Sequence, residues 1–103
     1  MSEPIRLIEK QVIETHQRQL EVFGGAPGLR DAGALASALN RPINRWSYEQ
    51  AGLPELAAAY AYGLARSHAF VDGNKRMSFL AMVGFLILNG VAFDPDPDES
   101  EAM

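Results

Sequence analysis

The fold is decided by the stretch from His68 to Gly90, which reads HAFVDGNKRMSFLAMVGFLILNG. Its second half predicts a helix over about 77–89, because one stripe at helical spacing collects Met77, Leu80, Ala81, Gly84, Phe85 and Leu88. Most of the remaining positions are apolar too, and a helix that is apolar nearly all round is buried. Asn89-Gly90 is a typical C-terminal cap. We therefore predict a compact all-α bundle around one buried central helix.

Three further helices are predicted upstream of this stretch. Apolar residues recur at helical spacing over Ile5–Phe23, and Gly24-Gly25 supplies a stop. Asp31 can cap a short helix that runs to about Asn40 and ends at Arg41-Pro42, since the residue before a proline avoids the helical region. An alanine-rich helix follows over Glu55 to about Ala69. Its small side chains let another helix approach closely.

Composition limits the class of protein. The 103 residues suit one domain over 1–103, with an acidic, turn-like tail at 94–103. The formal charge of −4 argues against nucleic acid as a primary ligand. No cysteine is present, which fits the reducing cytoplasm. The longest apolar run, Phe79–Leu88, is about half of the roughly 20 residues that a membrane span needs, and we see no secretory signal.

The residues that carry chemistry lie where the central helix begins. Free N–H groups and the dipole of a helix N-terminus favour an anion, and Gly73 allows its close approach. Asn74, Lys75 and Arg76 add an amide and two cations to the same turn. Cations at a helix N-terminus disfavour the helix unless an anion such as phosphate binds there. This run therefore predicts a phosphate site.

Asp72 and His68 each have two interpretations. Asp72 could cap the following helix, or it could hold Mg²⁺ beside a polyphosphate, since Mg²⁺ typically uses one or two carboxylates. A lone histidine is usually structural. His68, however, ends the preceding helix and can face the same pocket, and histidine titrates near neutral pH, as a general base should.

A glycine-rich segment, Gly24-Gly25-Ala26-Pro27-Gly28, cannot continue a helix. One interpretation is a plain connector, which is what most such loops are. The other is an exposed flap on which a target protein docks, formed by Gly24, Gly25, Gly28 and Arg30.

The run His68–Arg76 resembles the signature of the Fic/Doc (Fido) family, His-x-Phe-x-Asp/Glu-Gly/Ala-Asn-Gly/Lys-Arg. It is most similar to the death-on-curing toxin branch, where a lysine replaces the second glycine, as Lys75 does here. Flanking segments extend the resemblance over most of the chain: Gly24–Asp31, Leu35–Pro42 and Phe85–Gly90.

The resemblance implies a role for each signature residue. His68 would activate a target hydroxyl, Asp72 would hold Mg²⁺, and a phosphate cradle would be lined by Gly73, Asn74, Lys75 and Arg76. In this family the lysine version goes with transfer of the γ-phosphate of ATP to a Ser or Thr hydroxyl. Phe79 also stands where adenylylating members carry a second phosphate-binding arginine, whereas Gly73 matches those members. We favour phosphoryl transfer, with AMP transfer as the alternative.

The resemblance also implies partners. Many relatives carry an inhibitory helix with the pattern Ser/Thr-x-x-x-Glu-Gly/Asn, and no Ser or Thr of this sequence fits it. We therefore expect a toxin restrained by an antitoxin in trans and directed at a translation factor. Members of this branch continue for about one more helix, which is either absent here or cut at Met103. That absence motivates a third reading, a truncated binding module without catalysis, and a plain helical scaffold ranks last.

Overall fold

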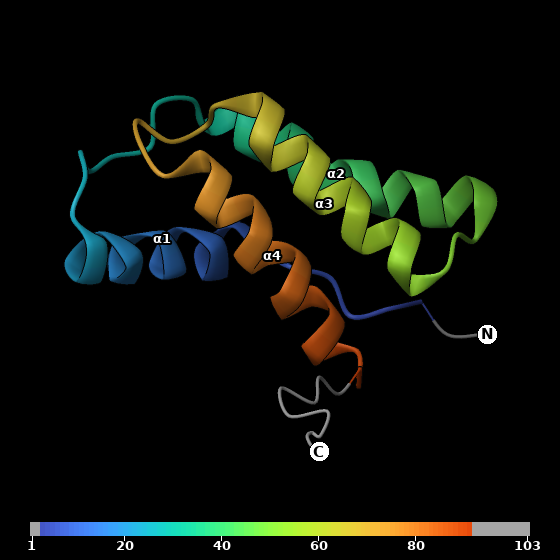
Figure 1. The fold of residues 1–103 in the computed structure, drawn as a ribbon. Helices are drawn as coiled ribbons and strands as arrows, with labels where there is room; N and C mark the ends of the chain where they lie inside the picture. Colours follow the sequence, from blue (N-terminus) through green and yellow to red (C-terminus); the bar gives the residue numbers. More distant parts are fainter. Residues whose placement is uncertain (1–2, 92–103) are drawn as a thin grey trace, which may run out of the picture.

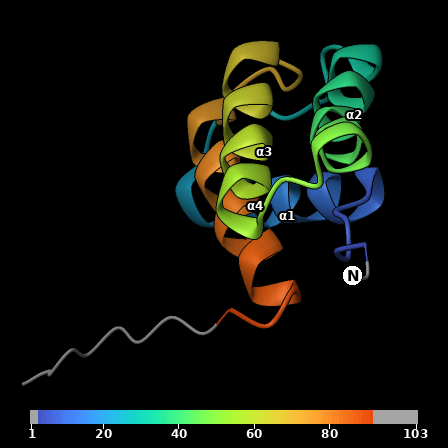
Figure 2. The ribbon, with the colours of Figure 1, turned by 90° about the vertical axis from the view of Figure 1, so that its right-hand side faces the viewer.

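The computed structural model describes residues 3–91, which contain four α-helices. In chain order they are α1 (Glu9–Phe23), α2 (Ala32–Glu49), α3 (Leu53–Ser67) and α4 (Asn74–Leu88). Helices α2 and α3 lie side by side as an antiparallel pair, α4 packs against α3, and α1 crosses against α4 and α2 (Figures 1 and 2). The all-α prediction is confirmed, and the predicted acidic tail at 94–103 lies outside the described residues.

The core joins the facing sides of these helices. Its largest fully buried side chains come from α2, α3 and α4, and they are Leu35, Leu56, Tyr60, Leu64 and Phe85. The rings of Tyr60 and Phe85 pack with their centroids 4.9 Å apart. Burial raises the pKa of Tyr60, whose hydroxyl oxygen accepts a hydrogen bond from the Leu7 N–H at 3.1 Å. This contact fastens the extended N-terminal segment to the core.

Helix α1 begins later than its apolar pattern predicts. The pattern starts at Ile5, but residues 5–8 are extended and the helix starts at Glu9. The backbone of this segment bonds elsewhere: Ile5 exchanges hydrogen bonds with Asn89, and Leu7 donates to Tyr60. These partners satisfy the backbone without a helix. The predicted stop is confirmed, because Gly24 caps α1 with φ +79°.

Helix α2 does not end at Arg41-Pro42, and that prediction is wrong. The Asp31 cap is confirmed, since its Oδ1 accepts from the Ala34 N–H at 3.0 Å, but the helix continues through Pro42 to Glu49. Pro42 has no N–H to donate to the carbonyl of Ala38 one turn earlier. Pro42 is buried, and the next turns of α2 carry Trp46 onto the core. This packing outweighs the loss of one hydrogen bond.

Helix α4 is buried on one side, in contrast to the burial all round that its composition predicts. Met77, Ala81 and Phe85 are buried, whereas Phe79 is 59% exposed and Ile87 is 57% exposed. Within residues 3–91 only α3 and α1 make substantial contact with this helix. Apolar composition therefore overestimates its burial here. Among the described helices, none is both long and apolar enough to cross a membrane.

Candidate phosphate site at the start of α4

The segment between α3 and α4, residues 68–73, is called the signature loop. It begins at His68, which caps α3 in the left-handed conformation with φ 49°, unusual for a residue other than glycine. It ends at Gly73, which caps α4 with φ +79°. Between these turns Ala69 and Phe70 are buried and anchor the loop in the core.

Asn74 holds the signature loop in shape from the first turn of α4. Its side-chain Oδ1 accepts from the Phe70 N–H at 3.0 Å, and its Nδ2 donates to the Phe70 carbonyl at 2.8 Å. Both polar atoms of the side chain are thus engaged with one backbone unit. What Asn74 can still offer to a phosphate is its main-chain N–H and the second hydrogen of Nδ2.

The glycine-rich segment, here called the glycine loop (residues 24–31), pairs with the signature loop. The Val71 N–H donates to the Gly28 carbonyl at 3.1 Å, the Arg30 N–H donates to the Ala69 carbonyl at 2.7 Å, and Leu29 forms an antiparallel bridge with Phe70. The Arg30 side chain donates through Nε to the His68 carbonyl at 3.1 Å. The glycine loop therefore supports the signature loop. Docking of a target on it remains a prediction.

Asp72 is placed by both loops and does not cap α4. Its Oδ1 accepts from the Gly73 N–H at 2.8 Å, and its Oδ2 accepts from the Ala26 N–H at 3.3 Å. A Cβ on Gly25 would lie 3.0 Å from Oδ2, so only glycine leaves the carboxylate this space. Each oxygen keeps a further lone pair, and the residue is exposed. The N-cap position belongs to Gly73, which has no capping side chain.

His16, on α1, is a member of this site that sequence reasoning missed. It is 3% exposed, and its ring stacks on Phe70 with centroids 3.9 Å apart. Its Nε2 lies 2.8 Å from the Asp72 carbonyl oxygen, which can only accept, so Nε2 is the donor. The signal was available, because Val12, His16 and Leu20 are spaced by four on the inner face of a helix.

Residues 71–76 surround one open hollow at the start of α4. Its volume is about 340 Å³, and its lining consists of Val71, Asp72, Gly73, Asn74, Lys75 and Arg76. The N–H groups of the first helical turn have no partner within the helix and carry the positive end of its dipole. That turn contains no acidic residue, and both Lys75 and Arg76 are exposed. The arrangement favours a phosphate.

Of the two cations, Arg76 contacts an aromatic ring, and His68 lies outside the hollow. The Arg76 guanidinium carbon lies 4.3 Å from the centroid of the Phe23 ring at the end of α1, a distance that suits a cation–π contact. His68 is exposed at the end of α3 and does not line the hollow. The structure thus brings Asp72–Arg76 together and leaves His68 at the entry to the same loop.

The residues present fit a Mg²⁺ ion that arrives with a nucleotide. No group of three or more His, Cys, Asp or Glu side chains able to hold a metal occurs among the described residues. Asp72 offers a single carboxylate beside a hollow suited to phosphate. Mg²⁺ is commonly held by one or two carboxylates together with phosphate oxygens and water. Mg²⁺ is therefore expected to bind with ATP rather than alone.

Comparison with known proteins shows the family of this chain. The model of the Fic/DOC family matches residues 6–86. "Protein kinase doc" of Escherichia phage P1 is 33% identical over 90 residues, which cover 86% of this chain and 71% of that protein. "Toxin Doc" of Mycolicibacterium smegmatis is 45% identical over 84 residues, which cover 77% of this chain and 64% of the toxin, just under two thirds of its length. The chain belongs to the Fic/DOC family.

Proposed function

We propose that this protein is a toxin that transfers the γ-phosphate of Mg-ATP to a Ser or Thr hydroxyl of a protein in the translation machinery. The observation that carries the proposal is the hollow at the start of α4, where an exposed carboxylate, free N–H groups and Lys75 meet. The names of the relatives, a protein kinase and a toxin, support the same reading. A kinase that uses ATP to modify translation factors would act in the cytoplasm, where both are found.

Each signature residue has a task in this reaction. His68 takes the proton of the target hydroxyl, whose oxygen bonds to the γ-phosphorus as that phosphorus separates from the bridging oxygen of the departing ADP. Asp72 would hold Mg²⁺, which when bound would neutralise charge on the phosphate oxygens. The first-turn N–H groups, Lys75 and Arg76 hold the phosphates. Because little covalent chemistry falls to the protein, positioning and charge supply most of the catalysis.

AMP transfer is the second candidate, and Gly73 is the observation in its favour. This glycine matches the adenylylating branch of the family, but its φ of +79° is a backbone reason for glycine that needs no nucleotide. Lys75 points the other way, because its side chain occupies space that a glycine would leave open to the α-phosphate. Phe79, 59% exposed on α4, offers no charge where an arginine would bind phosphate. Phosphoryl transfer remains the better supported reaction.

An antitoxin in trans is the partner that this proposal requires. One relative is named a toxin, and no Ser or Thr of the printed sequence fits the inhibitory pattern of relatives, so restraint by another chain is the expected control. A non-catalytic module that only binds antitoxin or target is the remaining alternative. The arrangement of Asp72, Lys75 and Arg76 around one hollow disfavours it, since binding alone would not need that set.

The test is intact-mass analysis of purified bacterial translation factors after incubation with this protein and Mg-ATP. We expect a gain of one phosphate on one factor, and no gain with the His68→Ala variant. Arg18→Gln, a change on the exposed side of α1, is the matched control and should retain the activity. A gain of one AMP would establish the alternative reaction. No modification of any factor, with Mg-ATP binding intact, would favour the non-catalytic module.

A further inference from the structure

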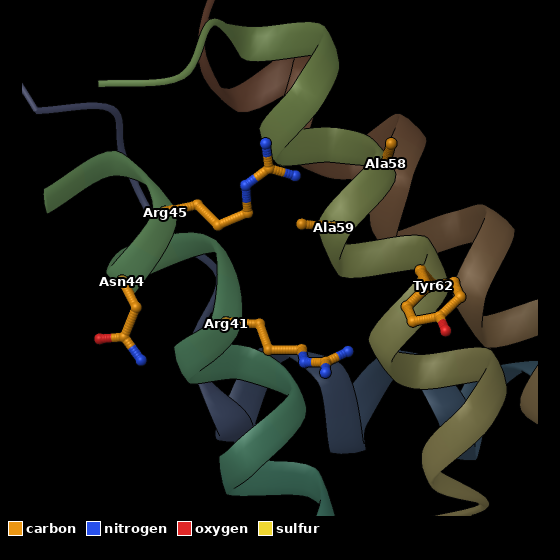
Figure 3. A pocket seen from close by; sticks show the side chains of 6 residues that line it. All are labelled: Arg41, Asn44, Arg45, Ala58, Ala59 and Tyr62. Atoms are coloured by element: carbon orange, nitrogen blue, oxygen red, sulfur yellow. The ribbon is translucent and has the colours of Figure 1, made fainter. Parts of the chain in front are cut away.

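A groove between α2 and α3 gathers positive charge on an otherwise acidic chain. Its volume is about 520 Å³, and its lining is Arg41, Asn44 and Arg45 from α2 with Ala58, Ala59 and Tyr62 from α3. Figure 3 shows both arginine side chains extending from α2 toward α3, with Ala59 on the side of α3 that faces them. We call this the arginine groove. The protein as a whole carries a charge of −4, so the cluster is a local reversal of sign.

Tyr62 brings two guanidinium groups together at this groove. The guanidinium carbon of Arg41 lies 5.6 Å from the centroid of the Tyr62 ring, and that of Arg66 lies 5.2 Å from it. Arg66 also donates to the Tyr62 hydroxyl at 2.8 Å. The ring is about half exposed and holds both cations at the surface. Two guanidinium groups on one tyrosine ring concentrate positive charge, which a bound anion would offset.

No carboxylate is among the residues that line the groove, although Glu49 on α2 pairs with one of its arginines. Within residues 3–91 two ion pairs form, and the one at the groove joins Arg45 to Glu49 at 3.1 Å on the same helix. Arg41 and Arg66 take part in neither of them. Arginine presents a planar fork of donors that matches carboxylates in pairs. Ala58 and Ala59 have small side chains, which leave room for a peptide segment beside the arginines.

The groove continues toward the proposed catalytic loop. A second hollow, of about 300 Å³, shares Arg41 with the arginine groove and follows the same two helices. Its lining includes Gly63, Arg66 and Ser67, and Ser67 immediately precedes His68. Gly63 lies so close to α2 that its Cβ would come 3.3 Å from the Ala38 carbonyl. The path therefore runs along α2 and α3 to the residue that would deprotonate the target.

We propose that the arginine groove binds an acidic segment of the target protein and so directs a neighbouring hydroxyl to His68. The groove's role in transfer rests on the proposed function, whereas the binding of an acidic chain does not. Carboxylates of the segment pair with Arg41, which lines both hollows, and with Arg66 in the second hollow, while its smaller side chains lie beside Ala58 and Ala59. Contacts at such a distance from the chemistry set which hydroxyl is presented without touching the phosphate.

A protein segment fits better than nucleic acid. Binding of nucleic acid draws on phosphate contacts spread over a basic surface, and this chain has 13 acidic against 9 basic residues. The cations here are confined to one groove, with small apolar residues between them. Such a site discriminates in favour of a short acidic chain with compact side chains.

The test is fluorescence anisotropy of a fluorescein-labelled hexaglutamate peptide titrated with the full chain at low salt, beside a labelled hexalysine peptide and a labelled six-nucleotide single-stranded DNA. We expect the glutamate peptide to bind and hexalysine not to. The double variant Arg41→Gln/Arg66→Gln should weaken this binding about tenfold, as expected for loss of a charge-assisted contact. The matched control is Lys10→Gln/Arg18→Gln, which removes the same charge from α1 and should leave the affinity unchanged.

Three results would overturn the proposal. An equal loss of affinity in the matched control would mean that net charge, and not the groove, attracts the peptide. DNA that binds more tightly than hexaglutamate, and loses affinity in the groove variant, would make the site one for nucleic acid. A large gain of affinity in the variant Asp94→Asn/Asp96→Asn/Asp98→Asn would mean that the acidic C-terminal residues of this chain occupy the groove.

Transfer kinetics then separate docking from chemistry. With a factor that accepts phosphate, Arg41→Gln/Arg66→Gln should raise the KM for that factor about tenfold and leave the KM for ATP and kcat unchanged. A loss confined to kcat would contradict docking. Failure to find any accepting factor would count against the proposed function and leave the binding result standing by itself.

Discussion

Asn74 and Asn89 lie at opposite ends of α4 and make the same kind of contact. Asn74 exchanges two hydrogen bonds with the backbone of Phe70, at 3.0 and 2.8 Å. Asn89 exchanges two with the backbone of Ile5, at 2.7 and 2.9 Å. The first asparagine fixes the loop that bears the candidate site, and the second fixes the N-terminal segment. The two asparagines share residue type and bonding pattern, so neither feature distinguishes the functional end of the helix. The two ends differ in the segment that each asparagine holds in place.

The surroundings of the two ends differ in charge. At the start of α4, Lys75 and Arg76 are exposed in a turn that favours anions, so a bound phosphate would stabilise the helix there. Around the end of α4 the exposed side chains are apolar, with Ile87 57% and Leu88 40% exposed. The comparison predicts that variants at the start impair transfer and variants at the end impair only folding.

Among the variants that test this comparison, Asp72→Asn should have the largest effect on transfer. Asparagine keeps one oxygen that can accept from the Gly73 N–H, whereas the exposed Ala26 N–H loses its acceptor and can turn to water, so the melting temperature should fall only slightly. The negative charge that orients Mg²⁺ is lost, and the rate of γ-phosphate transfer should fall by about a hundredfold or more. Initial rates over a Mg²⁺ titration measure this. A rate restored to that of the parent chain at high Mg²⁺ would contradict catalysis through this carboxylate and leave it a role in affinity alone.

Asn74→Ala should come next and should affect both properties. Removal of the amide leaves the N–H and carbonyl of Phe70 without partners, at a cost of about 1–3 kcal/mol in the free energy of unfolding. The loosened loop should slow transfer about tenfold to a hundredfold, since small displacements of catalytic groups are costly. Urea denaturation and initial rates, taken where the variant is fully folded, separate the two effects. Normal transfer in a destabilised variant would show that the clamp is only structural.

His16→Phe tests whether the buried histidine positions Asp72. Phenylalanine preserves the stack on Phe70 but cannot donate to the Asp72 carbonyl. We expect kcat to fall about fivefold, with a smaller change in the KM for ATP, because the loop is held less firmly. Val12→Ala, a buried neighbour on the same helix, is the control and should lower stability alone. If both variants reduce kcat equally, His16 has no specific role.

Asn89→Ala should have the smallest effect on transfer. It removes the bonds to Ile5 at the far end of α4, so the free energy of unfolding should fall by about 1–2 kcal/mol. The rate of transfer, measured where the variant is folded, should stay within about twofold of the parent, since nothing at the hollow changes. A rate loss equal to that of Asn74→Ala would remove the distinction between the two ends.

Local signals predicted much of this molecule. Gly24 ends α1 and Asp31 caps α2 as expected, because both act through the backbone within a few residues. Pro42 was wrongly predicted to end α2, because its burial against the core outweighs the tendency of proline to break a helix. The apolar composition of α4 overestimated its burial, because periodicity reports what a helix can bury and does not identify what covers it.

The candidate site shows the same division. Asp72 through Arg76 share one hollow because they are consecutive at a helix start, so their meeting was predictable. The contact of His16 with Asp72 spans 56 positions in the sequence, and only the packing of α1 against the signature loop brings them together. The arginine groove likewise needs two helices side by side before Arg41 and Arg66 meet on Tyr62.

The central claim is that the start of α4 transfers the terminal phosphate of ATP with His68 as the base. The most direct test is incubation of purified translation factors with this protein and Mg²⁺, using ATP labelled at either the γ- or the α-phosphate. We expect label on a factor from γ-labelled ATP only, and no label from either nucleotide with His68→Ala. Label transferred from α-labelled ATP, or γ-transfer undiminished in His68→Ala, would contradict it.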